Sequence, residues 1–201
     1  MSSAGNPTVP NRRGGLVVIS GPSGAGKSTV VRKLLVNCPL PLVLSVSATT
    51  RQPRQGEVDG VDYHFLSREE FQQRREAGQF LECKEVFGGG HWYGTLQSEV
   101  TAGLNANKWL ILEIDVQGAM SVLETHPKTV TIFVHSGSLE ELERRLRQRG
   151  TESEAQLQRR LEVARQELTY LDRYQYSIIN NDVSQAAREI CEILARHGAH
   201  A

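Results

Sequence analysis

The sequence predicts an α/β protein with a doubly wound parallel sheet, and three observations carry this prediction. A short apolar run at residues 16–20 ends in a glycine-rich turn, and a helix is expected to follow over residues 27–37. Apolar, strand-sized segments then alternate with helical segments along the chain. These segments are mostly apolar on both faces, which is typical of parallel strands covered by helices on each side. A ligand is expected at the carboxyl ends of such strands.

The elements follow in order along the chain. The expected strands of the main sheet are residues 16–20, 42–46, 108–115, 130–134 and 176–179. The expected helices around it are residues 27–37, 117–125, 138–148, 154–171 and 184–196. The two acidic residues of the third strand, Glu113 and Asp115, are two positions apart, so alternation places them on one face at its carboxyl edge. One of them is expected near Mg²⁺, and we favour Glu113; the alternative is a strand-end turn with exposed acids.

The pattern changes between residues 47 and 95. Residues 62–66 and 79–87 are expected as strands, and Ser67 with Glu70 forms a capping box that opens a helix through Ala77. We interpret this region as a small mixed β/α insertion that carries its own site. It interrupts a core formed by residues 14–46 and 96–201.

Composition narrows the class of protein. Of 201 residues, 39% are hydrophobic and 23% charged, which is ordinary for a soluble globular chain. The formal net charge is +0, so bulk attraction to nucleic acid or an anionic membrane is not expected. Residues 1–13 lack an apolar core and are expected to form a disordered tail, not a signal peptide, and no apolar run is long enough to span a membrane. We therefore expect a cytoplasmic protein with neither nucleic-acid nor membrane partners; oligomeric state is not readable.

Three cysteines are widely spaced along the chain and form no C-x-x-C motif. They are Cys38, Cys83 and Cys191. An odd, scattered set fits reduced thiols better than disulfides or a zinc site.

The glycine-rich turn matches G-x-x-x-x-G-K-[ST], the P-loop motif, between a strand and a helix. Its glycines let backbone N–H groups converge on a phosphate, and the following helix N-terminus adds partial positive charge. Lys27 can reach the β- and γ-phosphates of a nucleotide, and the Ser28 hydroxyl can ligate Mg²⁺. The expected ATP-binding residues of this segment are Gly21, Pro22, Ser23, Gly24, Ala25, Gly26, Lys27, Ser28 and Thr29.

Two groups of arginines suggest further anion binding. Arg51 and Arg54 lie three residues apart in a proline-restricted loop, and two guanidinium groups with the nearby Tyr63 hydroxyl suit a monophosphate. For this pair alone, an exposed basic loop is the alternative. Residues 140–165 hold seven more arginines around a helix break, as expected of a mobile lid over ATP phosphates: Arg144, Arg145, Arg147, Arg149, Arg159, Arg160 and Arg165. For any one of them a solvated helix face is the alternative, and we expect Arg144, Arg147, Arg159 and Arg165 to pair with Glu along the helix or to lie in water.

Taken together, these segments resemble guanylate kinase. The matching segments occur in the family's order and lie within residues 16–196: 21–28, 45–51, 56–63, 93–95 and 149–152. The chain departs from the family pattern at residues 88–92, where many members have a shorter turn and a tyrosine in place of Trp92. The resemblance implies a P-loop NTPase-type core with a GMP-binding insertion and a helical lid, acting on ATP and GMP with Mg²⁺ to give ADP and GDP.

The resemblance also implies roles for individual residues. The implied catalytic residues are Lys27, Arg51, Arg145, Arg149 and Arg160. Beyond the P-loop, the implied ATP-binding residues are Arg145, Arg149 and Asn180, and the implied metal ligands are Ser28 and Glu113. The implied GMP-binding residues are Ser47, Arg51, Arg54, Tyr63, Glu82, Tyr93, Thr95 and Asp115.

The Glu82 assignment also has a chemical reason. A carboxylate accepts from guanine N1–H and its 2-amino group together, whereas adenine presents an unprotonated N1 and no 2-amino group. A buried carboxylate left unpaired by the wrong base is costly, so the site can discriminate strongly. The alternative for Glu82 is a solvated strand residue.

Two other functions stay open from the sequence. A non-catalytic guanylate-kinase-like module would bind a phosphopeptide in the GMP pocket, and a coupled assay for ADP release separates it from an enzyme. A related P-loop kinase would act on another phosphorylated acceptor, such as a ribose bisphosphate. A substrate panel distinguishes that reading, and Glu82 with Thr95 argues for a purine acceptor.

Overall fold

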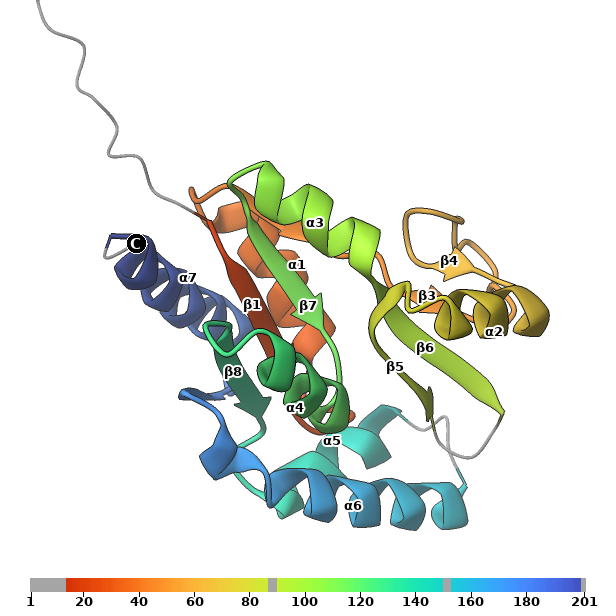
Figure 1. The fold of residues 1–201 in the computed structure, drawn as a ribbon. Helices are drawn as coiled ribbons and strands as arrows, with labels where there is room; N and C mark the ends of the chain where they lie inside the picture. The colour runs from red at the N-terminus through yellow and green to blue at the C-terminus, as the bar shows by residue number, and fades with distance from the viewer. Residues whose placement is uncertain (1–13, 87–89, 150–152, 200–201) are drawn as a thin grey trace, which may run out of the picture.

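The main sheet is parallel throughout and carries the P-loop at its centre. We describe a computed structural model in which residues 14–86, 90–149 and 153–199 are placed. The strand order is β2-β7-β1-β8-β9, and every neighbouring pair is parallel (Figure 1). The strands are β1 Leu16–Ser20, β2 Leu42–Leu44, β7 Trp109–Glu113, β8 Val130–His135 and β9 Tyr176–Ile179. This arrangement confirms the α/β parallel sheet that the sequence predicts.

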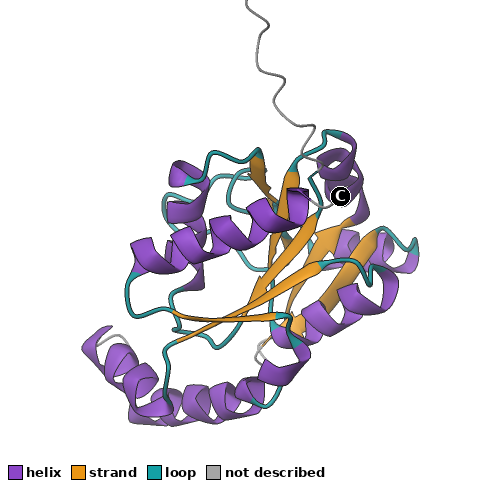
Figure 2. Ribbon diagram, turned by 90° about the vertical axis from the view of Figure 1, so that its left-hand side faces the viewer, coloured by secondary structure: helices purple, strands orange, loops and turns teal. Residues whose placement is uncertain are grey.

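Helices cover both faces of this sheet (Figure 2). Val17 and Ile19 of β1 pack with α1 (Lys27–Asn37) and α7 (Val183–Ala199). The alternate residues of β1, Leu16 and Val18, pack toward α3 (Gln97–Asn105) and α4 (Val116–Thr125). Because a strand buried on both faces needs apolar residues at every position, the continuous run 16–20 is the expected signature.

Residues 48–96 form a second, mixed sheet of order β4-β3-β6-β5. Its strands are β3 Ala48–Thr49, β4 His64–Phe65, β5 Phe80–Val86 and β6 His91–Leu96. The α2 helix (Arg68–Glu76) packs Phe71 on Phe80, with ring centroids 4.4 Å apart. Ser67 caps its start as predicted, since its hydroxyl accepts from the Glu70 N–H at 3.0 Å, whereas the Glu70 carboxylate accepts from Arg74. The β5–β6 pairing reaches Val86 and His91, and residues 87–89 lie outside the described part.

Two further helices lie at the carboxyl ends of the main strands (Figure 1). They are α5 (Leu139–Arg149) and α6 (Glu154–Leu168), followed by the short 3₁₀ helix η1 (Leu171–Arg173). They share their own apolar cluster of Leu142, Leu146, Leu157, Leu161 and Ala164. This pair corresponds to the predicted lid segment. Within the described ranges, no helix is both long and apolar enough to cross a bilayer.

Several element boundaries differ from the prediction, and β3, β6 and α3 were not predicted as elements. β7 ends at Glu113, since the Asp115 carboxylate accepts from the backbone N–H groups of Gln117 and Gly118 and thereby caps α4. The strand does not reach Asp115, so the predicted alternation of two strand acids is wrong. α3 was not predicted, because it begins after Leu96 without a side-chain cap. The predicted helix 154–171 ends at Leu168.

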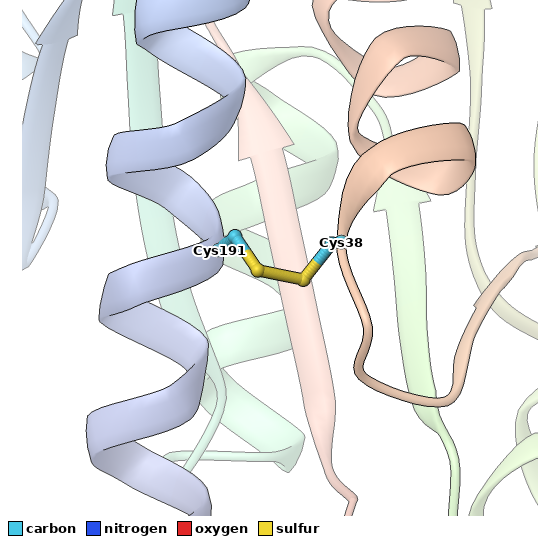
Figure 3. The surroundings of a disulfide bond; sticks show 2 residues. All are labelled: Cys38 and Cys191. Atoms are coloured by element: carbon cyan, nitrogen blue, oxygen red, sulfur yellow. A yellow bond between two sulfur atoms is a disulfide. The ribbon is translucent and has the colours of Figure 1, made fainter.

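The prediction of reduced, unpaired cysteines is wrong for two of the three. Cys38 and Cys191 form a disulfide with Cα atoms 5.8 Å apart, although 153 residues separate them (Figure 3). Cys38 follows α1 and Cys191 lies in α7, two helices that pack on the same face of the sheet. Spacing in the sequence carries no information about this tertiary contact. Cys83 is a free thiol.

Candidate active site

The P-loop connects β1 to α1 and closes around its own lysine. Gly26 caps α1 in the left-handed region at φ 87°, where a residue with a side chain is strained. The Lys27 ammonium donates to the carbonyl oxygens of Gly21 at 2.5 Å and Pro22 at 3.0 Å. Burial lowers the pKa of Lys27, and the carboxylates of Glu167, Glu113 and Asp115 act against that shift. The loop therefore holds a buried cation surrounded by acids.

Ser28 and Glu113 meet beside this lysine. The Ser28 hydroxyl donates to Glu113 Oε1 at 2.5 Å. The contact arises because β1 and β7 are neighbours and end together, with Ile19 paired to Glu113. A hydroxyl and a carboxylate are hard oxygen donors, so this pair suits Mg²⁺ held jointly by protein and phosphates. No group of three or more His, Cys, Asp or Glu residues within the described ranges forms a metal cage of its own.

Glu167 of α6 was not predicted, and it faces the P-loop. Its Oε2 accepts from the backbone N–H of Ser23 at 3.4 Å. Burial raises the pKa of Glu167, and the Lys27 charge opposes that shift. The sequence holds a signal for it: Glu167 lies three residues after buried Ala164, on the apolar stripe of α6. A carboxylate on such a stripe points to a buried partner.

Arg51 is the centre of a polar cluster on the second sheet. Two of its guanidinium nitrogens donate to the two oxygens of Glu57, each at 2.9 Å, and its Nε donates to the Tyr93 hydroxyl at 3.2 Å. The guanidinium also lies 5.4 Å from the centroid of the Tyr63 ring. Hydrogen bonds from Arg51 and from the backbone of Arg54 lower the pKa of Glu57. Glu57 was not assigned a role from sequence.

Three of the predicted GMP-binding residues make contacts other than those expected from the sequence. The Arg54 side chain is exposed, and its backbone N–H donates to Glu57 at 2.7 Å. Ser47 is half-buried, and its carbonyl accepts from the His64 N–H at 2.9 Å. Asp115 pairs with Lys84 of β5, a partner that sequence reasoning missed.

Glu82 and Thr95 form a polar pair on the second sheet, with Thr95 fully buried and Glu82 half-buried. They are direct partners across β5 and β6, and the Thr95 hydroxyl donates to Glu82 Oε1 at 2.7 Å. Burial raises the pKa of Glu82 to about 6, and the hydrogen bond from Thr95 opposes part of the shift. Glu82 is thus not a solvated strand residue.

The two halves of the site share electrostatic contacts. Burial is the largest of the causes that raise the pKa of Tyr63. The Tyr93 hydroxyl raises it further, and Glu113 at the end of β7 does so more weakly. Asp115 likewise raises the pKa of Glu82 after burial, and it supports the charge of Lys27. The ion pair between Lys84 of β5 and Asp115, the N-cap of α4, joins the second sheet to this edge of the main sheet.

A cavity of about 320 Å³ borders the P-loop at Gly24 and Gly26. Asn180 lines it, donating through Nδ2 to the carbonyl of Ala25 at 2.8 Å. Asn180 Oδ1 is buried and has no hydrogen-bond partner within the described residues. The other lining residues are Gly24, Gly26, Thr29, Arg145, Gln148 and Val183.

The predicted lid arginines are placed unequally. Arg145 lines this cavity and donates to Glu141 at 2.6 Å. Arg160 is half-buried on α6. Arg149 belongs to α5, but its side chain lies outside the described residues, as does the segment 150–152. Arg144, Arg147 and Arg165 form ion pairs with glutamates three or four residues away, as expected for solvated helix faces.

Comparisons with known proteins agree with this geometry. The family model of guanylate kinase matches residues 13–197. A guanylate kinase of Rhodopirellula baltica is 63% identical over 194 residues, which is 96% of this chain and 91% of that protein. One of Clostridium perfringens is 48% identical over 184 residues, covering 92% of this chain and 84% of that protein. The crystal structure of guanylate kinase from Anaplasma phagocytophilum matches with a TM-score of 0.75 and 36% identity, over 93% of this chain and 87% of that one. The chain belongs to the guanylate kinase family.

Proposed function

We propose that this chain transfers the γ-phosphoryl group of ATP to GMP, giving ADP and GDP. Family membership supports the reaction. The observation that carries the choice of acceptor is the buried Glu82–Thr95 pair, which lies on a sheet joined to the main sheet by the Lys84–Asp115 ion pair. Residues 47–95 act as the GMP-binding insertion in a core of residues 14–46 and 96–201, and residues 140–165 act as a lid.

Glu82 reads the guanine base. As a carboxylate it accepts from N1–H and the 2-amino group, while Thr95 holds one of its oxygens in place at 2.7 Å. Adenine offers no such pair of donors, so its binding leaves a buried charge unpaired. Asp115, paired with Lys84, neighbours the base from the N-cap of α4.

The Arg51 cluster binds the GMP phosphate. Glu57 fixes the plane of the Arg51 guanidinium through two hydrogen bonds, which reduces the freedom that binding a phosphate must remove. The Tyr63 and Tyr93 rings lie 5.8 Å apart and bring two hydroxyls to the same cluster. Ser47 and the exposed Arg54 complete the set.

The P-loop and the lid bind ATP. Residues 21–29 receive the phosphates through their backbone N–H groups, which Pro22 alone lacks, and Lys27 leaves the loop carbonyls to contact the β- and γ-phosphates. Arg145, Arg149 and Arg160 supply further positive charge from α5 and α6. The unpaired Asn180 Oδ1 accepts from the adenine amino group in the adjoining cavity.

Ser28 and Glu113 are the residues that would hold Mg²⁺, because their oxygen donors fit that ion. When bound, the ion offsets negative charge on the β- and γ-phosphate oxygens.

The protein's part in the reaction is positioning and charge. An oxygen of the GMP phosphate forms the new bond to the γ-phosphorus, and the bond from that phosphorus to the bridging oxygen of ADP breaks. The attacking oxygen is largely unprotonated at pH 7, so no general base is needed. Lys27, Arg51 and the lid arginines hold the two phosphates in line.

A coupled assay of ADP release tests this function with GMP, dGMP, AMP and UMP in parallel. We expect rapid turnover with GMP, and also with dGMP because the expected contacts are to base and phosphate. Turnover with UMP or a phosphosugar but not GMP would assign the chain to another acceptor. No ADP release with any acceptor, together with phosphopeptide binding, would make it a non-catalytic module.

A further inference from the structure

Gly118 lies against the carboxylate of Glu82. It is a buried residue in the first turn of α4, whereas Glu82 belongs to β5 of the second sheet. A Cβ at position 118 would lie 2.8 Å from Glu82 Oε2, closer than Cβ atoms approach other atoms, and 3.2 Å from its Cδ, which is tighter than most such contacts. The third atom near it, Ile114 Cδ1, is 3.5 Å away, which is ordinary contact. Glu82 is therefore the only tight neighbour of this position among the described residues.

The backbone at Gly118 does not itself require glycine. The residue is helical and is not among the glycines with positive φ. A glycine in a helix interior costs about 0.5–1 kcal/mol relative to alanine. The close approach of Glu82 is thus the structural reason for a glycine at this position.

Two contacts on the same elements keep Glu82 at this distance. Thr95 donates to Oε1 at 2.7 Å, so the other oxygen, Oε2, is the one that meets Gly118. The ion pair between Lys84 of β5 and Asp115, the N-cap of α4, joins the same two elements a second time. The carboxylate is confined between a hydroxyl and a helix turn that has no side chain there.

We propose that Gly118 is a positioning residue that determines specificity for guanine through Glu82. The missing side chain lets the carboxylate lie where both its oxygens serve the two guanine N–H donors. This inference rests on the proposed role of Glu82 in reading the base. A methyl group at position 118 displaces the end of the Glu82 side chain and not the backbone, so base recognition suffers more than the fold.

The first test is G118A, measured by steady-state kinetics and by calorimetric titration of GMP without ATP. A misplacement near 1 Å costs up to about 10²-fold in rate, so we expect kcat/KM for GMP to fall by about 10-fold to 10²-fold and KM and Kd for GMP to rise. The kcat/KM preference for GMP over AMP falls by a similar factor, while KM for ATP stays within about twofold. Unchanged GMP affinity and preference would overturn the proposal.

Gly103 offers a matched control. It is the other buried glycine of a described helix packed against the main sheet on this face, and its added Cβ would lie 2.9 Å from Leu110 Cδ1, away from Glu82. G103A therefore tests the same substitution against a core leucine. We expect it to change the unfolding midpoint and leave the GMP parameters at wild-type values.

The decisive comparison places G118A in an E82A background. Removing the Glu82 side chain removes the atoms that the new methyl group meets, so G118A should then change GMP binding by less than about twofold. An equal loss in both backgrounds would show that the effect does not pass through Glu82, and would overturn the proposal. If G118A alone does not fold, the proposal expects the double variant to fold, and an unfolded double variant overturns it.

These results separate the inference from the proposed function. If wild-type protein does not phosphorylate GMP, or if E82A leaves GMP affinity unchanged, the function or the role of Glu82 fails, whatever G118A does. If both behave as expected and G118A resembles wild type, only the inference fails.

Discussion

At the scale of single residues, the site contains charged groups that are held against their solvation preference. Burial lowers the pKa of Lys27 and raises those of Glu82 and Glu167. Such shifts are characteristic of functional sites, because a buried charge costs stability unless a ligand or a partner compensates it. Each of these residues should therefore affect activity and stability in opposite directions.

Glu82 gives the clearest case. Its folded-state pKa of about 6 lies above the usual 4.5, so the fold favours the protonated form. The resulting stabilisation is fully present below about pH 4.5 and is lost as pH rises through 6, amounting to about 2 kcal/mol at most. The free energy of unfolding of E82Q, measured with urea, should thus exceed that of wild type at pH 8. The difference should be smaller at pH 4. An equal difference at both pH values would contradict this.

GMP binding has the opposite pH requirement. Only the carboxylate accepts from both guanine donors, so kcat/KM for GMP should fall as pH drops below about 6, approaching tenfold per unit. The GMP phosphate also titrates near pH 6. E82Q therefore serves as the control, since it retains the phosphate titration and loses the Glu82 contribution. Identical pH profiles for the two proteins would remove Glu82 from base recognition.

Lys27 should be essential for turnover and dispensable for folding. Removal of one preorganised cationic contact costs about 10²–10³ in rate, by analogy with oxyanion-hole donors. We expect K27A to lose at least that much in kcat while its thermal midpoint stays at or above that of wild type, since an ammonium buried at the loop is removed. K33A, on the same helix, is the control. Turnover of K27A near the wild-type rate would refute the assignment.

At the scale of elements, prediction succeeded where the signal is local. The β1–loop–α1 unit follows from a buried strand, glycines at strained positions and a helix N-terminus, all adjacent in the chain. Ser28 and Glu113 were predicted together because parallel strands end at one edge. Asp115 was misplaced because its capping of α4 depends on a helix start that also looks like a strand end. Lys84 was missed because its partner Asp115 reaches it only through a tertiary contact. Glu57 was missed because its pairing with Arg51, six residues earlier, depends on the shape of an irregular loop that no periodic pattern predicts.

The position of Glu167 on α6 leads to a prediction about the pKa of Lys27. This carboxylate is the leading charge that supports the Lys27 ammonium, so its removal should lower the Lys27 pKa further. In E167Q the alkaline limb of the pH profile of kcat/KM for ATP should move to lower pH, with GMP affinity unchanged. E162Q, an exposed position of the same helix paired with Arg165, is the control. A profile that does not move would show that Glu167 leaves the lysine charge unaffected.

At the scale of the whole molecule, the disulfide joins the first helix of the fold, α1, to the last, α7. Cys38 follows the end of α1 opposite to the P-loop, and Cys191 lies in the last helix (Figure 3). The segment between them contains four of the five strands of the main sheet, all except β1. Cross-linking residues 153 positions apart restricts the unfolded chain, which stabilises a protein by about 3–5 kcal/mol. Sequence reasoning missed it because the pairing depends on α1 and α7 packing side by side.

Reduction should therefore lower stability and spare catalysis. We expect one thiol per oxidised chain, Cys83, to react with a thiol reagent under denaturing conditions, and three after reduction. The urea midpoint should fall with reductant in wild type and in C83A, but not in C38A/C191A, which should start at the lower value. Because both cysteines lie away from the loop end of α1, kcat for GMP at 25 °C should change by less than about twofold. Three reactive thiols in air-oxidised protein, or a midpoint insensitive to reductant, would show that the two helices are held by packing alone.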